Sequence, residues 1–586
     1  MNQYRTHNCG ELTKNDVGKQ VKIAGWVQTI RNLGGLLFIT LRDQYGLTQS
    51  IVTVESGLLE EAAKIPTEST ISIEGEVRLR GADINKNMVT GEIEVVAQKI
   101  EVLGKRSREL PFEVNSESDK EPPREDLRLQ YRFIDLRNEN LKNNILLRAK
   151  VLQYLRNQMI EQGFTEVQTP VLTSSSPEGA RDYLVPSRVH PGKFYALPQA
   201  PQQFKQLLMV SGIDKYFQIA PCFRDEDARA DRAPGEFYQL DMEMAFATQE
   251  DVFAAIEPVM YNTFKKFGGK EVAEYPFPRI AYKEAMFKYG TDKPDLRNPL
   301  IIQDVTDIFQ NIDFNAFKGK TIRTITVPNV QDVSRKFYDK MTAFAIEECG
   351  AKGLAWVKVL EDRSLQGSIA KFIDEDAKEN ILTSTNTQPG SAIFFIAEEE
   401  NKVATLAGKI REELGIRLDL IDKDVYKFCW IVDFPMYELN DEGKLDFCHN
   451  PFSMPQGGME DLKNKDPLDI LAYQYDIVCN GIELSSGAVR NHDPEIMVKA
   501  FEIAGYDQSV IEDKFPALFN AFHYGAPPHA GIAPGLDRMI MLMQDAPSIR
   551  EVIAFPMNSK AQDLMMGAPG NVSEQQLKDV HIKIDM

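Results

Sequence analysis

The sequence is poor in cysteine and in long apolar runs, and both deficits exclude classes of protein. Its six cysteines never form a C-x-x-C pair, which argues against a zinc site and against a dense disulfide framework. No apolar run approaches the roughly 18 residues that cross a bilayer, and the N-terminal stretch lacks the apolar core of a signal peptide. We therefore expect a cytoplasmic protein with reduced thiols and no membrane partner.

Two glycine-rich nucleotide motifs are also missing. No G-x-G-x-x-G occurs, which excludes the glycine loops of dinucleotide-binding proteins and of protein kinases. The single Gly-Lys-Thr, at residues 319–321, has Phe314 where a phosphate-binding P-loop needs its first glycine. Any nucleotide must therefore be held by another kind of site.

An excess of positive charge is absent as well. The chain carries 67 Lys and Arg against 87 Asp and Glu, a formal net charge of −20, and such a surface repels phosphate. The charge is unevenly distributed, because residues 1–105 hold 12 basic and 13 acidic side chains and are nearly neutral. The N-terminal segment can therefore still present a local basic face to a nucleic acid.

The chain is long enough for several domains. Its 586 residues, 43% of them hydrophobic, exceed the about 250 to 300 that a single core supports, so we expect at least three domains. Between Val21 and Gly104, five short β-rich stretches alternate with glycine-bearing turns. They predict a small barrel of the oligonucleotide-binding kind in a domain of residues 1–105.

The predicted barrel carries side chains that suit a nucleic acid. Barrels of this kind bind oligonucleotides through aromatic and basic side chains on one face. The candidates are Arg31, Phe38, Arg42, Gln49, Arg78 and Arg80. The alternative is that Phe38 belongs to the core and that the arginines form a solvated rim.

The chain after the barrel divides further. Residues 106–140 are polar, with irregularly spaced hydrophobic residues, and predict a linker. A helix over residues 140–162 leads into an extended stretch that ends at Thr169–Pro170. Residues 290–423 combine strand and helix signals with few candidate catalytic groups, so we interpret them as an α+β module inserted into a domain of residues 141–289 and 424–586.

The densest polar stretch lies between Phe223 and Met244 and has apolar, strand-like flanks. One interpretation is a solvated hairpin tip, because charge runs are usually solvated. Polar and apolar residues alternate in its second half, however, so Gln239, Asp241 and Glu243 would share one face of a strand. A face lined with carboxylates is suited to holding cations such as an ammonium or Mg²⁺.

A second element spans Gly525 to Leu542. A glycine-rich loop there delivers Arg538 to the start of an apolar helix. A guanidinium and helix N-terminal amides at such a position can meet phosphate or stack on a base.

Together, the stretch around Arg224 and the loop before Arg538 resemble motifs 2 and 3 of the class II aminoacyl-tRNA synthetases. The helix and strand before Thr169–Pro170 resemble motif 1, whose usual role is at the dimer interface. Residues 163–183, 197–206 and 290–297 make the whole chain similar to the bacterial-type aspartyl-tRNA synthetases.

The resemblance implies an α+β multidomain fold. It consists of a five-stranded OB-fold barrel that binds the anticodon, a catalytic domain built on an antiparallel sheet flanked by helices, and the inserted α+β domain typical of the bacterial type. It further implies a homodimer.

The resemblance also implies the reaction. L-Aspartate and ATP form aspartyl-adenylate and pyrophosphate, and aspartate is then transferred to the 3′-terminal adenosine of tRNA(Asp). In both steps charge develops on phosphate or carbonyl oxygens, so positioning and electrostatics suffice for catalysis. The catalytic residues by resemblance are Arg224, Glu226 and Arg538.

The nucleotide site follows from the same resemblance. Phe237 and Arg538 would sandwich adenine, and Arg224 would bridge aspartate and the α-phosphate. Asp476 and Glu483 match the acidic pair that holds Mg²⁺ on ATP, in keeping with the preference of this hard cation for oxygen ligands. The predicted ATP-binding residues are Arg224, Asp225, Glu226, Phe237, Glu483, Gly535, Leu536, Asp537 and Arg538.

Aspartate must be distinguished from asparagine. This requires fixed positive charge around the side-chain carboxylate, for which Arg490 and Lys205 are candidates, and acceptors around the ammonium. The predicted aspartate-binding residues are Glu178, Gln202, Lys205, Arg224, Asp241, His449 and Arg490.

For the barrel, the resemblance implies that Phe38 stacks on an anticodon base. It aligns Arg31, Gln49, Arg78 and Glu94 with hydrogen bonds to base edges, which favours a binding role over a core role for this face. Leu33 stands where enzymes that also charge tRNA(Asn) tend to carry histidine, so we expect the strict tRNA(Asp) form. The alternatives are the relaxed form, an asparaginyl-type synthetase and a non-catalytic paralogue.

The chain departs from the family pattern beside the site. Motif 2 has Ala233 in place of the usual glutamine, and Gly235 is extra. Ser485 and Ser486 stand where glycines are usual, and Asn450 replaces a second histidine. We expect these departures to alter contacts and to leave the reaction intact, because the charged groups are retained.

Overall fold

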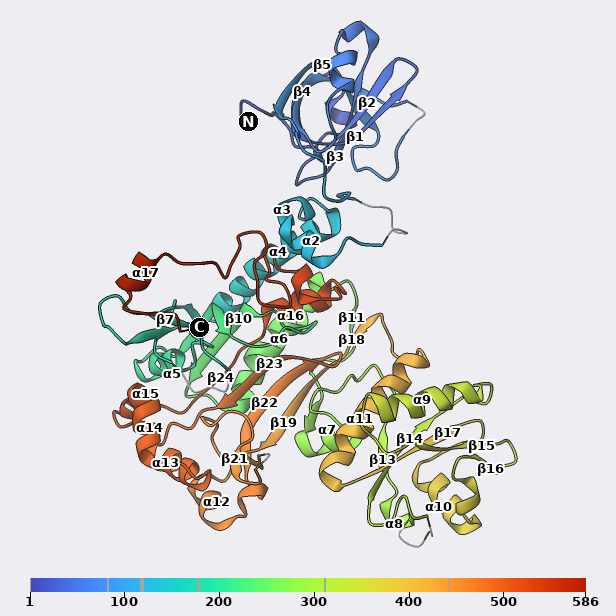
Figure 1. Ribbon diagram of the computed structural model, residues 1–586, viewed down its shortest axis with the longest axis vertical. Helices are drawn as coiled ribbons and strands as arrows, with labels where there is room; N and C mark the ends of the chain where they lie inside the picture. Colours follow the sequence, from blue (N-terminus) through green and yellow to red (C-terminus); the bar gives the residue numbers. More distant parts are fainter. Residues whose placement is uncertain are drawn as a thin grey trace. The chain divides into compact units, whose positions relative to one another are not determined.

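The computed structural model describes residues 2–81, 84–115, 121–175, 180–309, 312, 314–440 and 442–585. The chain forms two compact units, Met1–Glu113 and Val114–Met586 (Figure 1). None of the helices in the described ranges combines the length and apolarity that a bilayer crossing requires.

The first unit is a closed five-stranded barrel in the order β1-β2-β3-β5-β4. Its elements are β1 (Gln20–Leu33), β2 (Leu36–Arg42), β3 (Leu47–Val52), α1 (Leu59–Ala63), β4 (Thr70–Leu79) and β5 (Ile93–Gly104). Alternation along β2 sends Leu37, Ile39 and Leu41 into the core, whereas Phe38 points to the opposite face and is partly exposed. The predicted barrel is confirmed, and the alternative that Phe38 belongs to the core is wrong.

The second unit is built on an eight-stranded sheet in the order β12-β19-β22-β23-β24-β10-β9-β6. Its two edge pairs, β12–β19 and β6–β9, are parallel and the other pairs are antiparallel. The strands are β6 (Thr165–Glu166), β9 (Lys215–Arg224), β10 (Gly235–Ala245), β12 (Arg279–Ala281), β19 (Phe428–Pro435), β22 (Leu471–Cys479), β23 (Ile482–Val489) and β24 (His529–Ile532). The antiparallel sheet implied by the resemblance is therefore confirmed.

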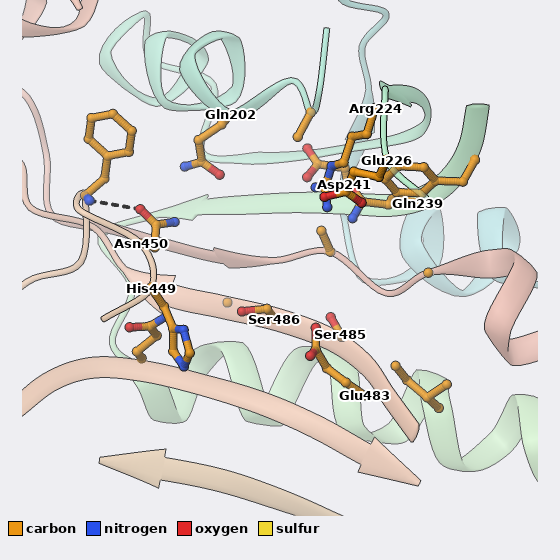
Figure 2. Close-up of a pocket in the computed structure, with 18 of the residues that line it drawn as sticks. Gln202, Arg224, Glu226, Gln239, Asp241, His449, Asn450, Glu483, Ser485 and Ser486 are labelled. Carbon is orange, nitrogen blue, oxygen red and sulfur yellow. Dashed lines mark hydrogen bonds between the residues drawn. The ribbon is translucent and has the colours of Figure 1, made fainter. Parts of the chain in front are cut away.

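Three helices cover one face of this sheet: α4 (Glu139–Glu161), α6 (Gln249–Phe267) and α16 (Leu536–Met543). Leu155, Met242 and Trp430 are among the buried residues that join them to the strands. The opposite face opens into a cavity (Figure 2). Other helices of this body are α5 (Gln202–Val210), α12 (Gly458–Asn464), α13 (Pro494–Ile503), α14 (Gln508–Lys514), α15 (Pro516–Phe522) and α17 (Glu574–Asp579).

Three small two-stranded sheets complete this body. They pair β7 (Leu184–Pro186) with β8 (Phe194–Ala196), β11 (Glu271–Val272) with β18 (Val425–Tyr426), and β20 (Tyr437–Leu439) with β21 (Leu445–Phe447).

The inserted segment forms its own five-stranded sheet in the order β13-β14-β17-β15-β16. It contains β13 (Ile302–Asp304), α8 (Thr306–Phe309), β14 (Thr321–Val327), α9 (Arg335–Glu347), β15 (Ala355–Val359), β16 (Leu365–Gly367), α10 (Glu375–Ser384), β17 (Ala392–Glu398) and α11 (Glu400–Arg417). Before it, α7 (Tyr282–Tyr289) ends at Gly290, which has φ +71°. A Cβ at Gly290 would lie 2.6 Å from the Cα of Gly408 in α11. The boundaries set at residues 105, 140, 289 and 423 stay predictions.

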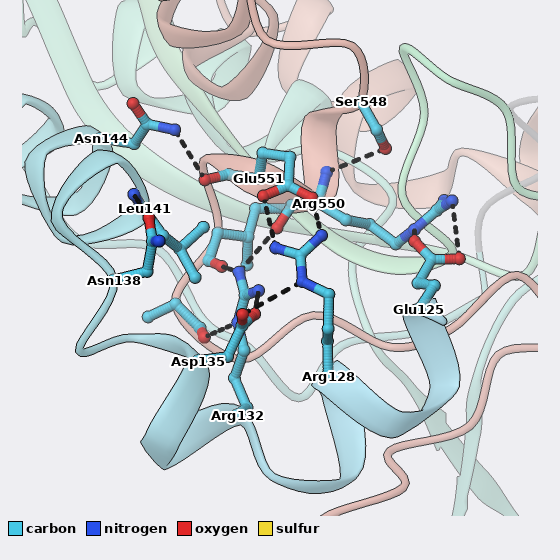
Figure 3. Close-up of polar contacts among 12 residues, drawn as sticks. Glu125, Arg128, Arg132, Asp135, Asn138, Leu141, Asn144, Ser548, Arg550 and Glu551 are labelled. Atoms are coloured by element: carbon cyan, nitrogen blue, oxygen red, sulfur yellow. Dashed lines mark hydrogen bonds and ion pairs between the residues drawn. The ribbon is translucent and has the colours of Figure 1, made fainter. Parts of the chain in front are cut away.

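The predicted linker 106–140 is wrong in its second half. Helices α2 (Glu125–Gln130) and α3 (Arg132–Asp135) form there and contact the segment after α16 (Figure 3). Arg128 donates two hydrogen bonds to Glu551, at 2.8 and 2.9 Å, and Arg132 donates to the carbonyl oxygens of Arg550 and Ile553. The sequence pattern missed these helices because charged contacts, rather than an apolar stripe, fix them.

The Arg128–Glu551 pair predicts a pH-dependent contribution to stability. Burial by itself raises the pKa of Glu551, but the hydrogen bonds and charge of Arg128 outweigh it and hold that pKa below its usual value. The contribution is therefore complete above the usual carboxyl pKa of about 4.3 and is lost as the pH falls through the lowered folded-state pKa. Glu551→Gln should destabilise the protein by about 1 to 3 kcal/mol at pH 7, with a smaller difference below about pH 4.

Unfolding temperatures of wild type and Glu551→Gln, measured by calorimetry from pH 3.5 to 8, check this expectation. Glu442→Gln is the control, because the Glu442–Lys444 pair is exposed on both sides and should contribute little. A difference between wild type and Glu551→Gln that does not change with pH would contradict the role assigned to the charge.

Candidate active site

The cavity has a volume of about 910 Å³ and gathers most of the predicted site residues (Figure 2). Those that line it are Gln202, Lys205, Arg224, Glu226, Phe237, Asp241, His449, Glu483, Arg490, Gly535, Asp537 and Arg538. Asp225, Leu536 and Asp476 do not line it: Asp225 faces Arg181 at 3.8 Å, Leu536 is a core residue, and Asp476 is buried. Glu178 lies outside the described residues.

One wall of the cavity is the hairpin of β9 and β10, which pairs Arg224 with Gly235 and Phe237 with Cys222. The Arg224 guanidinium lies 4.9 Å from the centre of the Phe237 ring, close enough for a cation–π interaction. Its Nε is buried and has no hydrogen-bond partner among the described residues. A guanidinium donor without a partner can bind an anion, and the adjacent aromatic ring can stack on a planar group of the same ligand.

The start of α16 lines the cavity beside β10, where Gly535 pairs with Gln239. Arg538 donates to the carbonyl oxygen of Glu483 at 2.7 Å and pairs with the carboxylate of Asp231 at 3.2 Å. The buried Asp537 carboxylate accepts hydrogen bonds from Arg148 of α4 and from the backbone N–H of Tyr238. Asp537 therefore connects α16 to α4 and β10. It thereby positions Phe237 and Arg538, the side chains predicted to hold adenine.

Four buried charges lie under the cavity, each at most 2% exposed. Lys205 Nζ is 2.7 Å from Asp241 and 3.4 Å from Glu243, and Arg490 donates two hydrogen bonds to Glu243, at 2.9 and 3.3 Å. The carboxylate face predicted on β10 is thus real, and in the free protein it holds the protein's own cations. The alternation of polar and apolar residues along β10 predicted that Glu243 lies on the carboxylate face, but no individual role was predicted for it.

The two carboxyl groups of this cluster are shifted in opposite directions. Burial raises the pKa of Asp241 above its usual value, and Lys205 compensates only in part. For Glu243, the charges of Arg490 and Lys205 outweigh burial and lower the pKa. Asp241 Oδ2 has no hydrogen-bond partner in the described part of the chain, so it can accept from a bound ammonium.

Asp476 and Glu483 form an acidic pair on neighbouring strands β22 and β23. Burial and then the charge of Glu483 raise the pKa of Asp476 well above its usual value. Asp476 Oδ1 is buried without a partner among the described residues. Such an acidic pair, which Lys293 and Ser486 compensate only in part, fits a divalent cation. The remaining oxygen ligands would come from phosphate and water, since no cluster of three metal-binding side chains occurs in the described ranges.

The departures from the family pattern have local partners. The Ser486 hydroxyl forms a hydrogen bond with Asp476, and Asn450 accepts the backbone N–H of Phe452 at 2.9 Å. His449 packs edge-on against Phe434 on the cavity wall. Gly235 has φ +87°, and a Cβ there would lie 3.3 Å from the Met557 sulfur. These residues contact their neighbours around the cavity, and the charged groups that line it are present.

In the barrel, the five predicted anticodon residues share one outer face. Arg31 pairs with Phe38 across β1 and β2. Glu94 accepts hydrogen bonds from Gln49 at 2.9 Å and from Arg78 at 2.8 Å, which joins β3, β4 and β5. The arrangement combines a partly exposed aromatic ring with donors and acceptors, as single-stranded nucleic acid requires. Leu33 is 63% exposed at the end of β1.

Comparison with known proteins places this architecture in a class. Residues 124–559 match the family described as tRNA synthetases class II (D, K and N), and residues 21–103 match the OB-fold nucleic acid binding domain. The fold and cavity are therefore those of a class II tRNA synthetase.

Full-length relatives show which family within this class the chain belongs to. The aspartate–tRNA ligase of Streptomyces avermitilis is 55% identical and is matched over 100% of this chain and 99% of its own length. The aspartate–tRNA(Asp/Asn) ligase of Zymomonas mobilis is 57% identical, over 100% of this chain and 98% of its own length. The chain belongs to the aspartate–tRNA ligase family and is an aminoacyl-tRNA ligase.

Solved structures agree at the level of the fold. A putative aspartyl-tRNA synthetase from Leishmania major Friedlin gives a TM-score of 0.60 at 21% identity, covering 95% of this chain and 94% of that chain. The asparaginyl-tRNA synthetase from Pyrococcus horikoshii complexed with asparaginyl-adenylate gives 0.59 at 19% identity, covering 94% and 97%. At these identities the likeness establishes the fold alone.

Sequence reasoning missed one cavity residue in the insertion. Lys293 lines the cavity and lies 3.2 Å from Glu483, although residues 290–423 were expected to carry few catalytic groups. The signal was available, because residues 290–297 carry part of the family resemblance, but local spacing did not show that Lys293 reaches the acidic pair.

Proposed function

We propose that the chain activates L-aspartate with ATP and transfers it to the 3′-terminal adenosine of tRNA(Asp). The observation that carries the proposal is the cluster of Lys205, Asp241, Glu243 and Arg490 under the cavity. It offers an acceptor for an amino-acid ammonium, at Asp241, and fixed positive charge for a side-chain carboxylate, at Lys205 and Arg490.

The chemistry needs no side-chain nucleophile. In the first step an aspartate carboxylate oxygen attacks the α-phosphorus of ATP, and pyrophosphate leaves with the electrons of the broken P–O bond. Arg224, with its unpartnered Nε, stabilises the charge that develops on the α-phosphate oxygens. In the second step the terminal hydroxyl of tRNA attacks the aspartyl carbonyl carbon and AMP departs. Phe237 and Arg538 hold adenine so that these groups meet in line.

Aspartate is preferred over asparagine because the cluster cannot use a neutral amide well. Glu243 holds the Nε and Nη2 atoms of Arg490, which leaves the Nη1 edge to donate to the substrate carboxylate. An asparagine amide would place an N–H donor against the same guanidinium. His449 and Gln202 complete the amino-acid side of the cavity.

Asp476 and Glu483 would hold Mg²⁺, whose charge neutralises the nucleotide phosphates when it is bound. The protein's own contribution is to hold the Asp476 and Glu483 carboxylates near each other, with a hydrogen bond between Ser486 and Asp476. Glu226 is held by Arg232 at 2.9 Å and faces the same cavity, where it contacts ATP.

The barrel face of Arg31, Phe38, Gln49, Arg78 and Glu94 binds the anticodon by stacking and edge contacts. We propose the strict form, because Leu33 presents an apolar side chain at the exposed end of β1. The relatives named above include ligases of both tRNA(Asp) alone and tRNA(Asp/Asn), so this choice needs its own test. We further propose that the protein acts in the cytoplasm as a homodimer.

Aminoacylation with radiolabelled aspartate, ATP and Mg²⁺ tests the proposal on purified tRNA(Asp) and tRNA(Asn) separately. We expect charging of tRNA(Asp) alone, and a Leu33→His variant that gains charging of tRNA(Asn). Charging of both by the wild type would contradict the role of Leu33 and leave the catalytic assignment standing. Charging of neither, without aspartate-dependent pyrophosphate exchange, would contradict the proposed activity.

A further inference from the structure

The segment that opens the insertion reaches Glu483, the member of the acidic pair that lines the cavity. Lys293 Nζ lies 3.2 Å from the Glu483 carboxylate and 3.4 Å from that of its neighbour Asp292. Its side chain is 42% exposed and lines the cavity. The ammonium is therefore available to a molecule bound there.

This segment is held firmly on both sides. Arg411 of α11, which is buried, donates to the carbonyl oxygens of Asp295 at 3.0 Å and Asn298 at 2.7 Å. On the other side, a Cβ at Gly481 in the β22–β23 turn would lie 3.2 Å from the Asp295 Cβ. The inserted domain and the catalytic sheet thus jointly fix the backbone that carries Lys293.

The charges around Lys293 indicate what it contacts. Asp292, Asp476 and Glu483 supply three carboxylates, and Lys293 is the cation that pairs with two of them. Asp476 and Glu483 would hold a divalent cation on the nucleotide, and this cation would supply positive charge to the phosphates. An ammonium beside the same carboxylate therefore faces the same phosphates.

We propose that Lys293 binds the β- and γ-phosphates of ATP and stabilises the departing pyrophosphate, so that the insertion contributes a substrate contact to the known reaction. The inference rests on the proposed function, because it takes Asp476 and Glu483 as the cation-binding pair. An ammonium with three donors is suited to polyphosphate oxygens. When the bond between the α-phosphorus and the bridging oxygen breaks, the electron pair passes to pyrophosphate, and Lys293 lies where that charge develops.

The test compares nucleotides that differ only in these phosphates. Binding of ATP and of AMP to the full chain with Mg²⁺ is measured by calorimetric titration for wild type, Lys293→Met, Lys293→Arg and Lys288→Met. Lys288→Met is the matched control, since Lys288 pairs only with Glu284 on the surface of α7 among the described contacts. We expect Lys293→Met to weaken ATP binding about tenfold, the loss of one charge-assisted hydrogen bond.

The same variant should leave AMP binding unchanged, and Lys293→Arg should recover most of the ATP affinity. In pyrophosphate exchange, the KM for ATP should rise with Lys293→Met and not with Lys288→Met. Equal weakening of ATP and AMP, unchanged ATP binding, or tighter ATP binding through a freed Mg²⁺ site would each overturn the proposal. Failure of the wild type to bind ATP or to catalyse exchange would instead contradict the proposed function.

Discussion

Arg224→Lys should lower the kcat of aspartate-dependent pyrophosphate exchange by about 10²- to 10³-fold, the cost of removing one preorganised donor at a developing charge. Lysine keeps the positive charge and loses the planar fork, so it can neither lie over Phe237 in the same way nor present the buried Nε donor. Because the lost contact forms chiefly in the transition state, kcat should fall more than the affinity for ATP.

Steady-state exchange kinetics over a range of aspartate and ATP concentrations check this expectation. Arg188→Lys, at an exposed position, is the matched control and should behave as wild type. Circular dichroism of Arg224→Lys should show an intact fold, since Arg224 is half-buried and is the last residue of β9. An exchange rate near that of wild type would show that Arg224 does not contact the reacting phosphate.

Glu243→Gln should destabilise the second unit by about 3 to 5 kcal/mol, because it leaves the buried charge of Arg490 without its partner. Arg490 now uses two hydrogen bonds on Glu243 and lies 2% exposed beside Lys205. A neutral amide offers one acceptor instead of two, and the excess positive charge stays in a low-dielectric environment. The KM for aspartate should also rise, since Arg490 is no longer held in place.

Guanidinium unfolding followed by circular dichroism measures the change in stability. Glu250→Gln is the control, because the Glu250–Arg279 pair has the same chemistry, with two contacts at 2.6 Å, but is about half exposed. Its loss should cost at most about 1 kcal/mol. Similar values for the two variants would mean that burial does not govern the Glu243–Arg490 pair.

The barrel shows which predictions local spacing can support. Its strands alternate between the core and the outer face, so the positions of Leu37, Ile39 and Leu41 follow from a period of two residues. Turn glycines marked where strands end. The helices of residues 125–135 escaped the same reasoning, because their contacts lie more than 400 positions away: Arg128 forms an ion pair with Glu551, and Arg132 donates to the carbonyl oxygen of Arg550.

The residues proposed for the site were predictable in part. Arg224, Asp241 and Arg538 lie in stretches whose composition and family resemblance single them out, and the structure brings them to one cavity. The partner of Arg490 was not predictable, since Glu243 lies 247 residues earlier in the chain. The pairing of Lys293 with Glu483 likewise depends on how the insertion folds back onto the β22–β23 hairpin.

The sequence by itself determined the barrel and the strand that carries the carboxylates, because both follow from periodicity over a few residues. The two motifs and the class of reaction followed from the resemblance of short stretches to a known family. The tertiary structure alone decided that the carboxylates of β10 hold Lys205 and Arg490, that Arg148 secures Asp537, and that Lys293 enters the site. Ion pairs between distant segments form only when folding brings those segments together, and no local pattern in the sequence shows which charges will meet.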